Sequence, residues 1–267
     1  MSRTASLLTL GLFFVSIVSG LIIVFAYHPS IAFGSVQKMN FLIPYGLFFR
    51  KLHYFSSEAF TIFLLFHILL ELIKNKIRIS SSSWNYSILG FIAVIILMFS
   101  GFVLKADLDA SGAAQVAFSL IKDTPVLKYL LPLFKDNSVF YYKFFIWHIV
   151  YLPLILTFAI YKHIDTLKVK STILSIAFGI TVLSMIVFKM PLDIIPGEKV
   201  KTLSSPWFFI GAEHLLQQAW TPLSINLFLS IPFFLLIVYF YTKYKYTTKS
   251  LLSLWILYYS YVSIFLP

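Results

Sequence analysis

The feature that most limits how this chain can fold is a series of apolar runs, most of them long enough to cross a lipid bilayer. The hydrocarbon core of a bilayer is about 30 Å thick, which roughly 20 residues of α-helix span. Lipid offers the backbone no hydrogen-bond partner, so long apolar runs form helices. We therefore predict an all-α, polytopic transmembrane helical bundle of about seven spans. The runs are Leu7–Ala26, Tyr45–Leu72, Trp84–Leu104, Phe140–Tyr161, Ser171–Phe188, Leu223–Tyr241 and the shortest, Leu251–Pro267.

Composition supports the membrane setting. The chain is 60% hydrophobic and only 12% charged, whereas a soluble domain carries about 25% charged residues. Its net charge of +11 is spread over short loops and not gathered on one face. This pattern indicates anchoring at a membrane surface and gives no reason to expect nucleic-acid binding.

The distribution of Lys and Arg predicts the orientation of the chain. The connections on the side of the N-terminus are short and rich in these cations, whereas the connections on the other side are longer and also carry acidic residues. Short cationic loops stay in the cytoplasm, so we expect a cytoplasmic N-terminus in a multi-pass protein of a prokaryotic cytoplasmic membrane. The cations of the short connections are Lys74, Lys76, Arg78, Lys162, Lys168, Lys170, Lys243, Lys245 and Lys249.

Two connections on the opposite, outer side are longer than simple links. The first, Ala106–Val139, contains the apolar stretch Val126–Phe134, and the second, Pro191–Pro222, contains the apolar stretch Trp207–Leu216. Both stretches fall on the same side of the membrane. We expect them to shape a pocket over any site in the outer half of the bundle.

Four histidines form two matched pairs within the apolar runs. His53 and His67 are 14 residues apart, and His148 and His163 are 15 residues apart. At about 1.5 Å and 100° per residue, either interval spans roughly 21 Å and returns to nearly the same helix face. Two such helices side by side bring His53 opposite His148, near the outer surface, and His67 opposite His163, near the cytoplasmic surface. Each pairing offers two imidazoles to a flat metal macrocycle, so the spacing predicts two bis-histidine haem sites.

A single histidine in a membrane span is at least as often an ordinary helix-to-helix hydrogen-bonding residue. Four histidines at two matched depths favour the ligand interpretation. The chain has no cysteine, so covalent haem attachment through its own thiols is excluded and the predicted cofactors are two non-covalent b-type haems. Arg50 and Lys143 precede His53 and His148 by about one turn. We predict that they pair with haem propionates, the alternative being that both reach toward the membrane surface.

The sequence around these histidines resembles a known family. Residues 46–53 (GLFFRKLH) and His67 resemble the second helix of cytochrome b, the di-haem subunit of bc-type and b/f-type quinol-oxidising complexes. Residues 143–153 (KFFIWHIVYLP) and His163 resemble its fourth helix. The unequal spacings of 14 and 15 residues resemble the b/f-type branch more closely.

This resemblance implies an organisation and a function. Residues 1–170 correspond to a four-helix di-haem core, and residues 171–267 correspond to three C-terminal helices that border a quinol site. The implied function is transmembrane electron transfer in a quinol-oxidising respiratory complex, between an outer quinol site and a cytoplasmic-side quinone site. Expected partners are membrane lipid, an iron–sulfur subunit of the Rieske type or a c-type cytochrome subunit, and a second copy of the complex in a homodimer.

The quinol site carries the clearest departure from the family. Residues 205–209 (SPWFF) resemble the motif Pro-Glu-Trp-Tyr-Phe that borders the family's quinol-oxidation site. Proline replaces the motif's glutamate and cannot accept a proton. Glu213 lies one helical turn beyond Phe209, and we predict that it replaces the missing carboxylate. The residues implied to border the site are Pro206, Trp207, Phe208 and Phe209.

Two alternatives remain. The lost glutamate favours a membrane anchor that conducts electrons between quinone and a peripheral dehydrogenase or reductase, instead of the redox subunit of a quinol:acceptor oxidoreductase. A cofactor-free transporter would require broken helices and paired charges at the bilayer midplane. The sequence offers only Glu58 there, which is either a proton relay or a contact for a neighbouring subunit.

Overall fold

The computed structural model describes residues 2–73, 80–125, 127–135, 139–164, 169–198 and 207–265. Within these ranges it contains helices and no strand, so the predicted all-α fold is confirmed. Short 3₁₀ turns, η1 (Pro29–Ile31) and η2 (Leu127–Leu130), and a π-helical turn, η3 (Trp147–Tyr151), connect some of the helices. The α-helices are α1 (Ser2–Val24), α2 (Ala32–Phe41), α3 (Gly46–Ile73), α4 (Ser81–Val103), α5 (Leu108–Lys122), α6 (Leu131–Phe134), α7 (Phe140–Ile146), α8 (Leu152–His163), α9 (Ser171–Val187), α10 (Trp207–Gln217), α11 (Pro222–Tyr241) and α12 (Lys245–Phe265).

All seven predicted runs form helices, and five described segments are long and apolar enough to cross a membrane. The two other runs are α9, which is apolar but has 17 residues, and α12, in which tyrosine and serine dilute the apolar residues. Helix α12 begins at Lys245 and not at Leu251. The five segments are Thr4–Val24, Gly46–Ile73, Ser81–Val103, Phe140–His163 and Pro222–Tyr241.

Helices α2 and α5 were not expected from the apolar pattern. In α5, buried alanines recur at the spacing of one helix face, and this face packs toward α4 and α11. Asp107 caps the helix, accepting a hydrogen bond from the Ala110 N–H at 2.9 Å. An alanine face among polar residues is not a long apolar run, which is why the sequence pattern alone did not reveal it.

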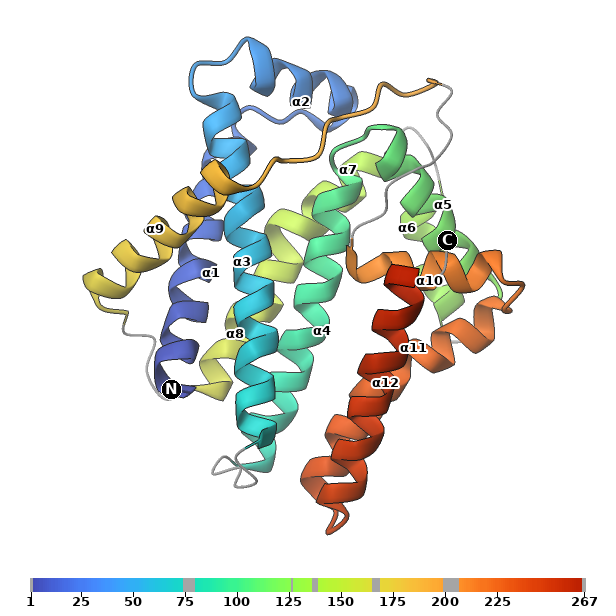
Figure 1. Cartoon of the computed structure of the whole chain (residues 1–267). Helices are drawn as coiled ribbons and strands as arrows, with labels where there is room; N and C mark the ends of the chain where they lie inside the picture. The colour runs from blue at the N-terminus through green and yellow to red at the C-terminus, as the bar shows by residue number, and fades with distance from the viewer. Residues whose placement is uncertain are drawn as a thin grey trace.

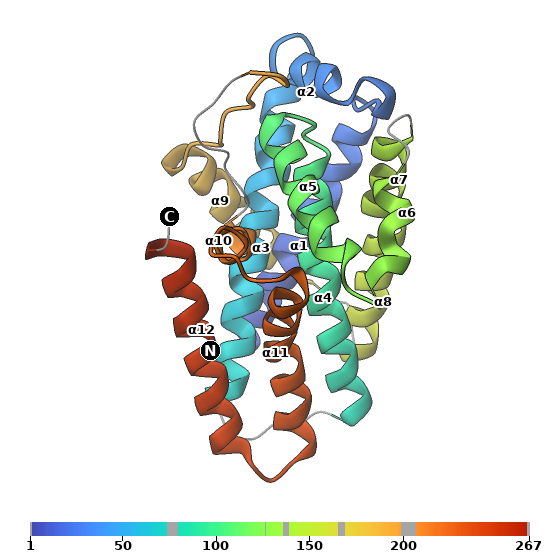
Figure 2. The ribbon, with the colours of Figure 1, turned by 90° about the vertical axis from the view of Figure 1, so that its right-hand side faces the viewer.

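The first four spans form a bundle of two helix pairs. Helix α1 packs along α3, and α4 packs along α8 (Figure 1). The start of α1, the end of α3 and the turn between α11 and α12 lie at the same end, toward the bottom of Figure 1, as the cation pattern requires. Helices α11 and α12 form an antiparallel hairpin beside the bundle, and α10 runs across the direction of the spans (Figures 1 and 2).

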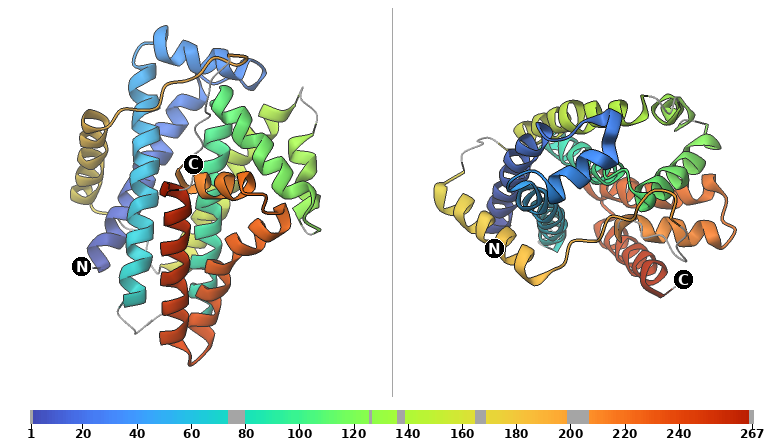
Figure 3. Two further views of the ribbon diagram at one scale, coloured as in Figure 1. Left: turned by 45° about the vertical axis from the view of Figure 1, so that its right-hand side comes forward. Right: turned by 90° about the horizontal axis from the view of Figure 1, so that it is seen from above.

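Helix α9 takes a different position from the other C-terminal helices. It packs against α1 and α3, on the opposite side of the bundle from the α11–α12 hairpin (Figure 3). The predicted division at residue 170 therefore separates α9 from the bundle in sequence although the two are in contact. That division remains a prediction.

A buried apolar layer joins the two helix pairs at mid-height. All four helices contribute buried residues to it, among them Phe13 from α1, Phe60 from α3, Val94 from α4 and Leu156 from α8. The Phe13 and Phe60 rings lie 5.5 Å apart. Phe60 is midway between His53 and His67 in the sequence, so this middle layer separates the two histidine levels.

A π-helical turn explains the unequal histidine spacings. In η3 the Leu152 N–H donates to the Trp147 carbonyl, five residues earlier instead of four. Pro153 follows and has no N–H to donate, which favours such an irregular turn at this position. Because a π turn holds one extra residue, the 15-residue interval on this helix covers the same height as the 14-residue interval on α3. Consistently, Leu156 is eight residues after His148 but seven before His163.

The middle layer leads to a stability prediction. Replacing Phe60, whose side chain is 7% exposed, by alanine opens a cavity between the helix pairs and should lower the free energy of unfolding by about 3 kcal/mol or more. Phe66 on the same helix is 46% exposed and provides the matched control. Thermal unfolding in detergent should show a clearly lower transition temperature for Phe60→Ala than for Phe66→Ala. Equal effects would contradict the role assigned to this layer.

Candidate metal centre

The structure brings the four histidines together in two facing pairs. In the upper pair, so named because His53 is near the start of α3, the upper end of that helix in Figure 1, the rings of His53 and of His148 in η3 have centroids 6.2 Å apart. In the lower pair, the rings of His67 on α3 and His163 at the end of α8 have centroids 6.3 Å apart. The pairs occupy two levels, above and below the middle layer. In the described part of the chain, no group of three or more His, Cys, Asp or Glu side chains could hold a metal ion.

The hydrogen bonds of the histidines involve the same ring nitrogen in all four residues. Each Nδ1 atom contacts an oxygen atom of α1 or α4, the helices that flank the ligand helices. This arrangement orients Nε2, the other ring nitrogen, for metal coordination, and such outer contacts normally set the tautomer of a ligand histidine. The contacts are His53 to the Ser16 carbonyl (2.9 Å), His67 to Ser6 Oγ (3.1 Å), His148 to Ser100 Oγ (2.9 Å) and His163 to Ser87 Oγ (2.7 Å).

Glycines leave room for the rings of the upper pair. A Cβ atom on Gly20 of α1 would lie 2.9 Å from Cε1 of His53, and a Cβ atom on Gly101 of α4 would lie 2.9 Å from Cε1 of His148. Both distances are too short for real carbon atoms, so only glycine is accommodated at these two positions without a shift of the imidazole. The close approach of α1 and α4 to the ligand histidines therefore depends on these residues.

This donor set fits the iron of a b-type haem. Metal–imidazole bonds of about 2 Å on opposite faces of one ion hold the ring centres roughly 6 Å apart, as found in both pairs. The α1–α3 and α4–α8 pairs make few backbone contacts with each other in the described part of the chain, so the histidines of facing helices meet through their side chains. Two imidazoles and no carboxylate or thiolate match bis-histidine haem and not a four-ligand zinc site.

Arg50, predicted to pair with a haem propionate, makes a bidentate ion pair with Asp193. Its Nη1 and Nη2 atoms each lie 2.6 Å from an Asp193 oxygen, and Nη1 also donates to Asn40 Oδ1 at 2.8 Å. Burial alone raises the pKa of the Asp193 carboxyl, but the hydrogen bonds and charge of Arg50 and a hydrogen bond from Asn40 outweigh it and lower that pKa. The ionised Asp193 carboxylate therefore ties the segment after α9 to α3. No spacing or motif in the sequence reveals this contact.

Lys143, the second residue predicted to pair with a propionate, also has protein partners. Its Nζ atom donates to the backbone carbonyls of Pro132 and Lys135, at 2.8 Å each. These bonds attach the start of α7 to the end of α6. The predicted propionate contacts of Arg50 and Lys143 remain predictions, and both cations stand on the ligand-bearing helices within about one turn of the upper pair.

The segment that resembles the quinol motif opens helix α10. Trp207 donates from its indole nitrogen to Glu58 Oε2 on α3 at 2.8 Å, which gives Glu58 a partner within the chain. The Phe208 carbonyl accepts a hydrogen bond from Tyr259 at 2.7 Å, and the Phe209 ring lies 5.5 Å from that of Phe99 on α4. These contacts hold α10 between α3, α4 and α12. Pro206 lies outside the described residues.

Glu213 and its neighbour lie on the half-buried part of α10. His214 contacts the Val262 carbonyl through Nδ1 at 2.8 Å, which ties α10 to α12. The carboxylate of Glu213 is half-buried. The role predicted for Glu213 therefore remains a prediction.

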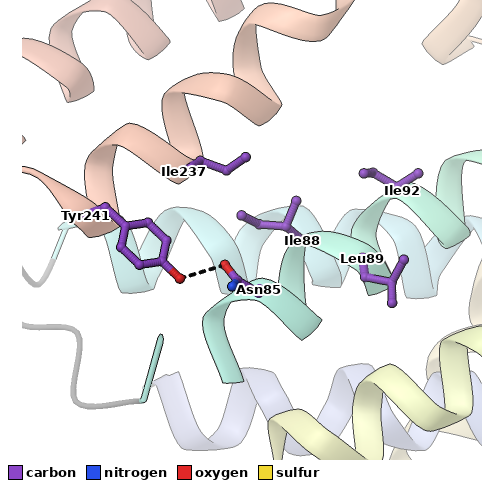
Figure 4. Close-up of a pocket in the computed structure, with 6 residues that line it drawn as sticks. All are labelled: Asn85, Ile88, Leu89, Ile92, Ile237 and Tyr241. Atoms are coloured by element: carbon purple, nitrogen blue, oxygen red, sulfur yellow. Dashed lines mark hydrogen bonds between the residues drawn. The ribbon is translucent and has the colours of Figure 1, made fainter. Parts of the chain in front are cut away.

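A separate groove of about 540 Å³ lies between α4 and α11 (Figure 4). Its walls are aliphatic, and the Tyr241 hydroxyl donates to Asn85 Oδ1 at 3.1 Å at one end. None of the predicted site residues lines it.

The fold and the site together define a membrane-spanning helical protein that presents two stacked, facing histidine pairs of the kind that hold haem. The family model described as cytochrome b/b6/petB matches residues 4–171, more than half of the chain. The chain therefore belongs to the cytochrome b family.

Individual relatives agree with this assignment. The chain is 31% identical over 116 residues to cytochrome b of Schizosaccharomyces octosporus and 30% identical over 112 residues to cytochrome b of Caenorhabditis briggsae. Each match covers about two fifths of this chain (42% and 41%) and spans only 30% of the length of the relative. A solved structure described as "Hyperthermophilic respiratory Complex III" has a similar fold, with a TM-score of 0.73 at 17% identity over 99% of this chain and 83% of its own. The closer resemblance to the b/f-type branch remains a prediction.

The two glycines lead to a prediction for the upper pair. In Gly101→Val the new side chain should displace the His148 imidazole, so the chain should lose the haem predicted for the upper pair and keep the haem of the lower pair. Gly179→Val makes the same change on α9, where a Cβ atom would meet nothing within 4 Å. The haem absorbance per purified chain should fall by about half in the first variant and stay unchanged in the control. Full haem content in Gly101→Val would contradict the close approach of α4 to His148.

Proposed function

We propose that this chain is the di-haem cytochrome b subunit of a quinol-oxidising membrane complex. The observation that supports this most strongly is the presence of two facing histidine pairs at two levels of one transmembrane bundle. His53 and His148 hold the outer haem, and His67 and His163 hold the cytoplasmic-side haem. Bound haem supplies single-electron transfer, while the chain supplies ligation, spacing and exclusion of water.

The bundle spaces and insulates the two centres. Fourteen residues of α3 separate His53 from His67, which corresponds to roughly 21 Å along the helix. The middle layer fills the bundle between them with Phe13, Phe60 and Leu156. The two haems would therefore be separated by a buried, apolar layer.

The orientation follows from the cations of the short connections. With the N-terminus in the cytoplasm, the upper pair lies near the outer face, and α10 contacts α3 at Glu58, just below His53 in the orientation of Figure 1. The quinol site is at α10, bordered by Trp207, Phe208, Phe209 and the preceding Pro206. A quinone site lies near the lower pair on the cytoplasmic side.

In the proposed reaction, quinol releases two electrons and two protons at the outer site. One electron would pass to a partner redox protein. For the other, the haems held by the upper and lower histidine pairs would supply one-electron redox chemistry between the outer site and a cytoplasmic-side quinone. Glu213 accepts one of the protons in place of the glutamate that Pro206 replaces. Arg50 and Lys143 pair with the propionates, so Arg50 shares its guanidinium with Asp193.

The fold similarity to a respiratory Complex III supports a multi-subunit assembly. We propose a Rieske-type iron–sulfur or c-type cytochrome subunit as the redox partner, in a homodimeric complex within a prokaryotic cytoplasmic membrane. One observation favours a second candidate function: Pro206 stands at the position of the motif glutamate. In this candidate function the chain is a membrane anchor that conducts electrons between quinone and a peripheral enzyme without dividing them between two acceptors.

The haem content tests the proposed function. Acidified acetone removes non-covalent haem, so extraction of the purified chain should release two b-type haems per polypeptide. His67→Leu should release one and leave the outer haem spectrum intact, because the two sites are about 20 Å apart. Fewer than two haems in the unaltered chain, or pigment that stays with the protein, would overturn the di-haem assignment.

The role of Glu213 is tested by the rate at which quinol reduces the outer haem. Glu213→Gln should slow this step about 100-fold or more, as expected for loss of a proton acceptor, with both haem spectra unchanged. Exposed Glu198, on the preceding segment, provides the control Glu198→Gln. Glu58→Gln is the informative comparison because Glu58 contacts Trp207 of the same motif. If only Glu58→Gln slows reduction, the proton acceptor is Glu58. If neither variant slows it, the membrane-anchor candidate is favoured.

A further inference from the structure

The two histidine pairs differ in what α1 and α4 present to them. At the upper pair, each helix presents a glycine, Gly20 or Gly101, to the imidazole. Fourteen residues away on the same faces, at the lower pair, the corresponding residues are Ser6 and Ser87. Both serine hydroxyls contact ligand histidines of the lower pair.

The hydrogen bonds of Ser87 determine which atom carries the proton. The Ser87 hydroxyl donates to the Ser83 carbonyl at 2.9 Å, so its proton is already used within α4. Its Oγ atom lies 2.7 Å from Nδ1 of His163 and therefore accepts a hydrogen bond there. Nδ1 of His163 carries the proton, and Nε2 keeps the lone pair that a metal needs.

Ser83 strengthens this arrangement from the preceding turn. Its hydroxyl donates to the backbone carbonyl of His163 at 3.0 Å and lies 3.3 Å from Nδ1 of the same residue. Ser83 is buried, and Ser87 is half-buried. The last residue of α8 is thus held at both its backbone and its ring by two serines of one helix face.

We propose that Ser87, assisted by Ser83, is a positioning residue that sets the tautomer of His163 and lowers the reduction potential of the cytoplasmic-side haem. This inference rests on the proposed function. A hydrogen bond donated by Nδ1–H shifts electron density toward the coordinating Nε2 atom, which favours the oxidised iron. The Ser6 hydroxyl lies 3.1 Å from Nδ1 of His67, the other ligand predicted for the same haem.

The upper pair provides an internal reference. His53 donates to the main-chain carbonyl of Ser16, and Nδ1 of His148 lies 2.9 Å from Ser100 Oγ, so the Nδ1 partners of the upper pair do not include Ser87. Changes at Ser87 should therefore alter one haem and not the other. This separation distinguishes tuning of a single ligand from general loosening of the bundle.

The test is a redox titration of the purified complex that follows both haems spectroscopically. Ser87→Ala removes the oxygen at 2.7 Å that accepts the hydrogen bond from Nδ1 of His163. The midpoint potential of the cytoplasmic-side haem should rise by about 59 mV, which corresponds to a roughly tenfold change in a one-electron reduction equilibrium. The outer haem should be unchanged. Ser87→Thr keeps a hydroxyl and should restore the original potential, and Ser82→Ala, at an exposed position of α4, is the matched control.

Each outcome decides the proposal. An unchanged potential in Ser87→Ala, with both haems bound, overturns it. If Ser87→Ala loses the cytoplasmic-side haem, recovery of the haem in Ser87→Thr supports the role of the hydroxyl and continued loss contradicts it. Failure of the proposed function is distinguishable, because the unaltered chain would then lack two haems before any serine is changed.

Discussion

Packing at mid-height of the bundle sets the positions of the remaining parts of the site. Phe13, Phe60, Val94 and Leu156 meet there and hold the α1–α3 and α4–α8 pairs in one register. Above and below this layer the imidazole pairs lie with ring centroids 6.2 and 6.3 Å apart. A shift of one residue in either ligand helix would rotate its histidines by about 100° and separate both pairs. The π turn at His148 supplies the one extra residue that this register requires.

Helices α1 and α4, which carry none of the four histidines, provide the hydrogen-bond partners of the histidine rings. Helices α1 and α4 provide no metal ligand, yet each imidazole has its Nδ1 atom against an oxygen of one of them. The upper level combines two glycines with the Ser16 carbonyl and the Ser100 hydroxyl, whereas the lower level uses the hydroxyls of Ser6 and Ser87. One bundle can therefore hold two chemically similar centres in different electronic environments, which a directional electron path across the membrane requires.

Contacts to α3 also position the outer segments. Asp193 pairs with Arg50 of α3, and Trp207 bonds to Glu58 of α3. The segment after α9 is also tied to the start of α5, because the Ile194 carbonyl accepts a hydrogen bond from the Leu108 N–H. The segments that border the proposed quinol site are thus attached to the helix that carries His53 and His67. A displacement at α10 would be transmitted directly to the ligand helix through these polar contacts.

The sequence by itself determined the spans and the candidate ligands, because apolar runs in lipid must form helices and a 14-residue interval returns to one helix face. It did not reveal α5, whose alanine face is no long apolar run, or the π turn that reconciles the two histidine intervals. The partners of Arg50 and Glu58 were also beyond it. Asp193 and Trp207 are more than 140 residues away in the chain, and no local periodicity encodes such a contact. Only the tertiary structure decided which oxygen each imidazole faces, since that depends on how four separate helices pack together.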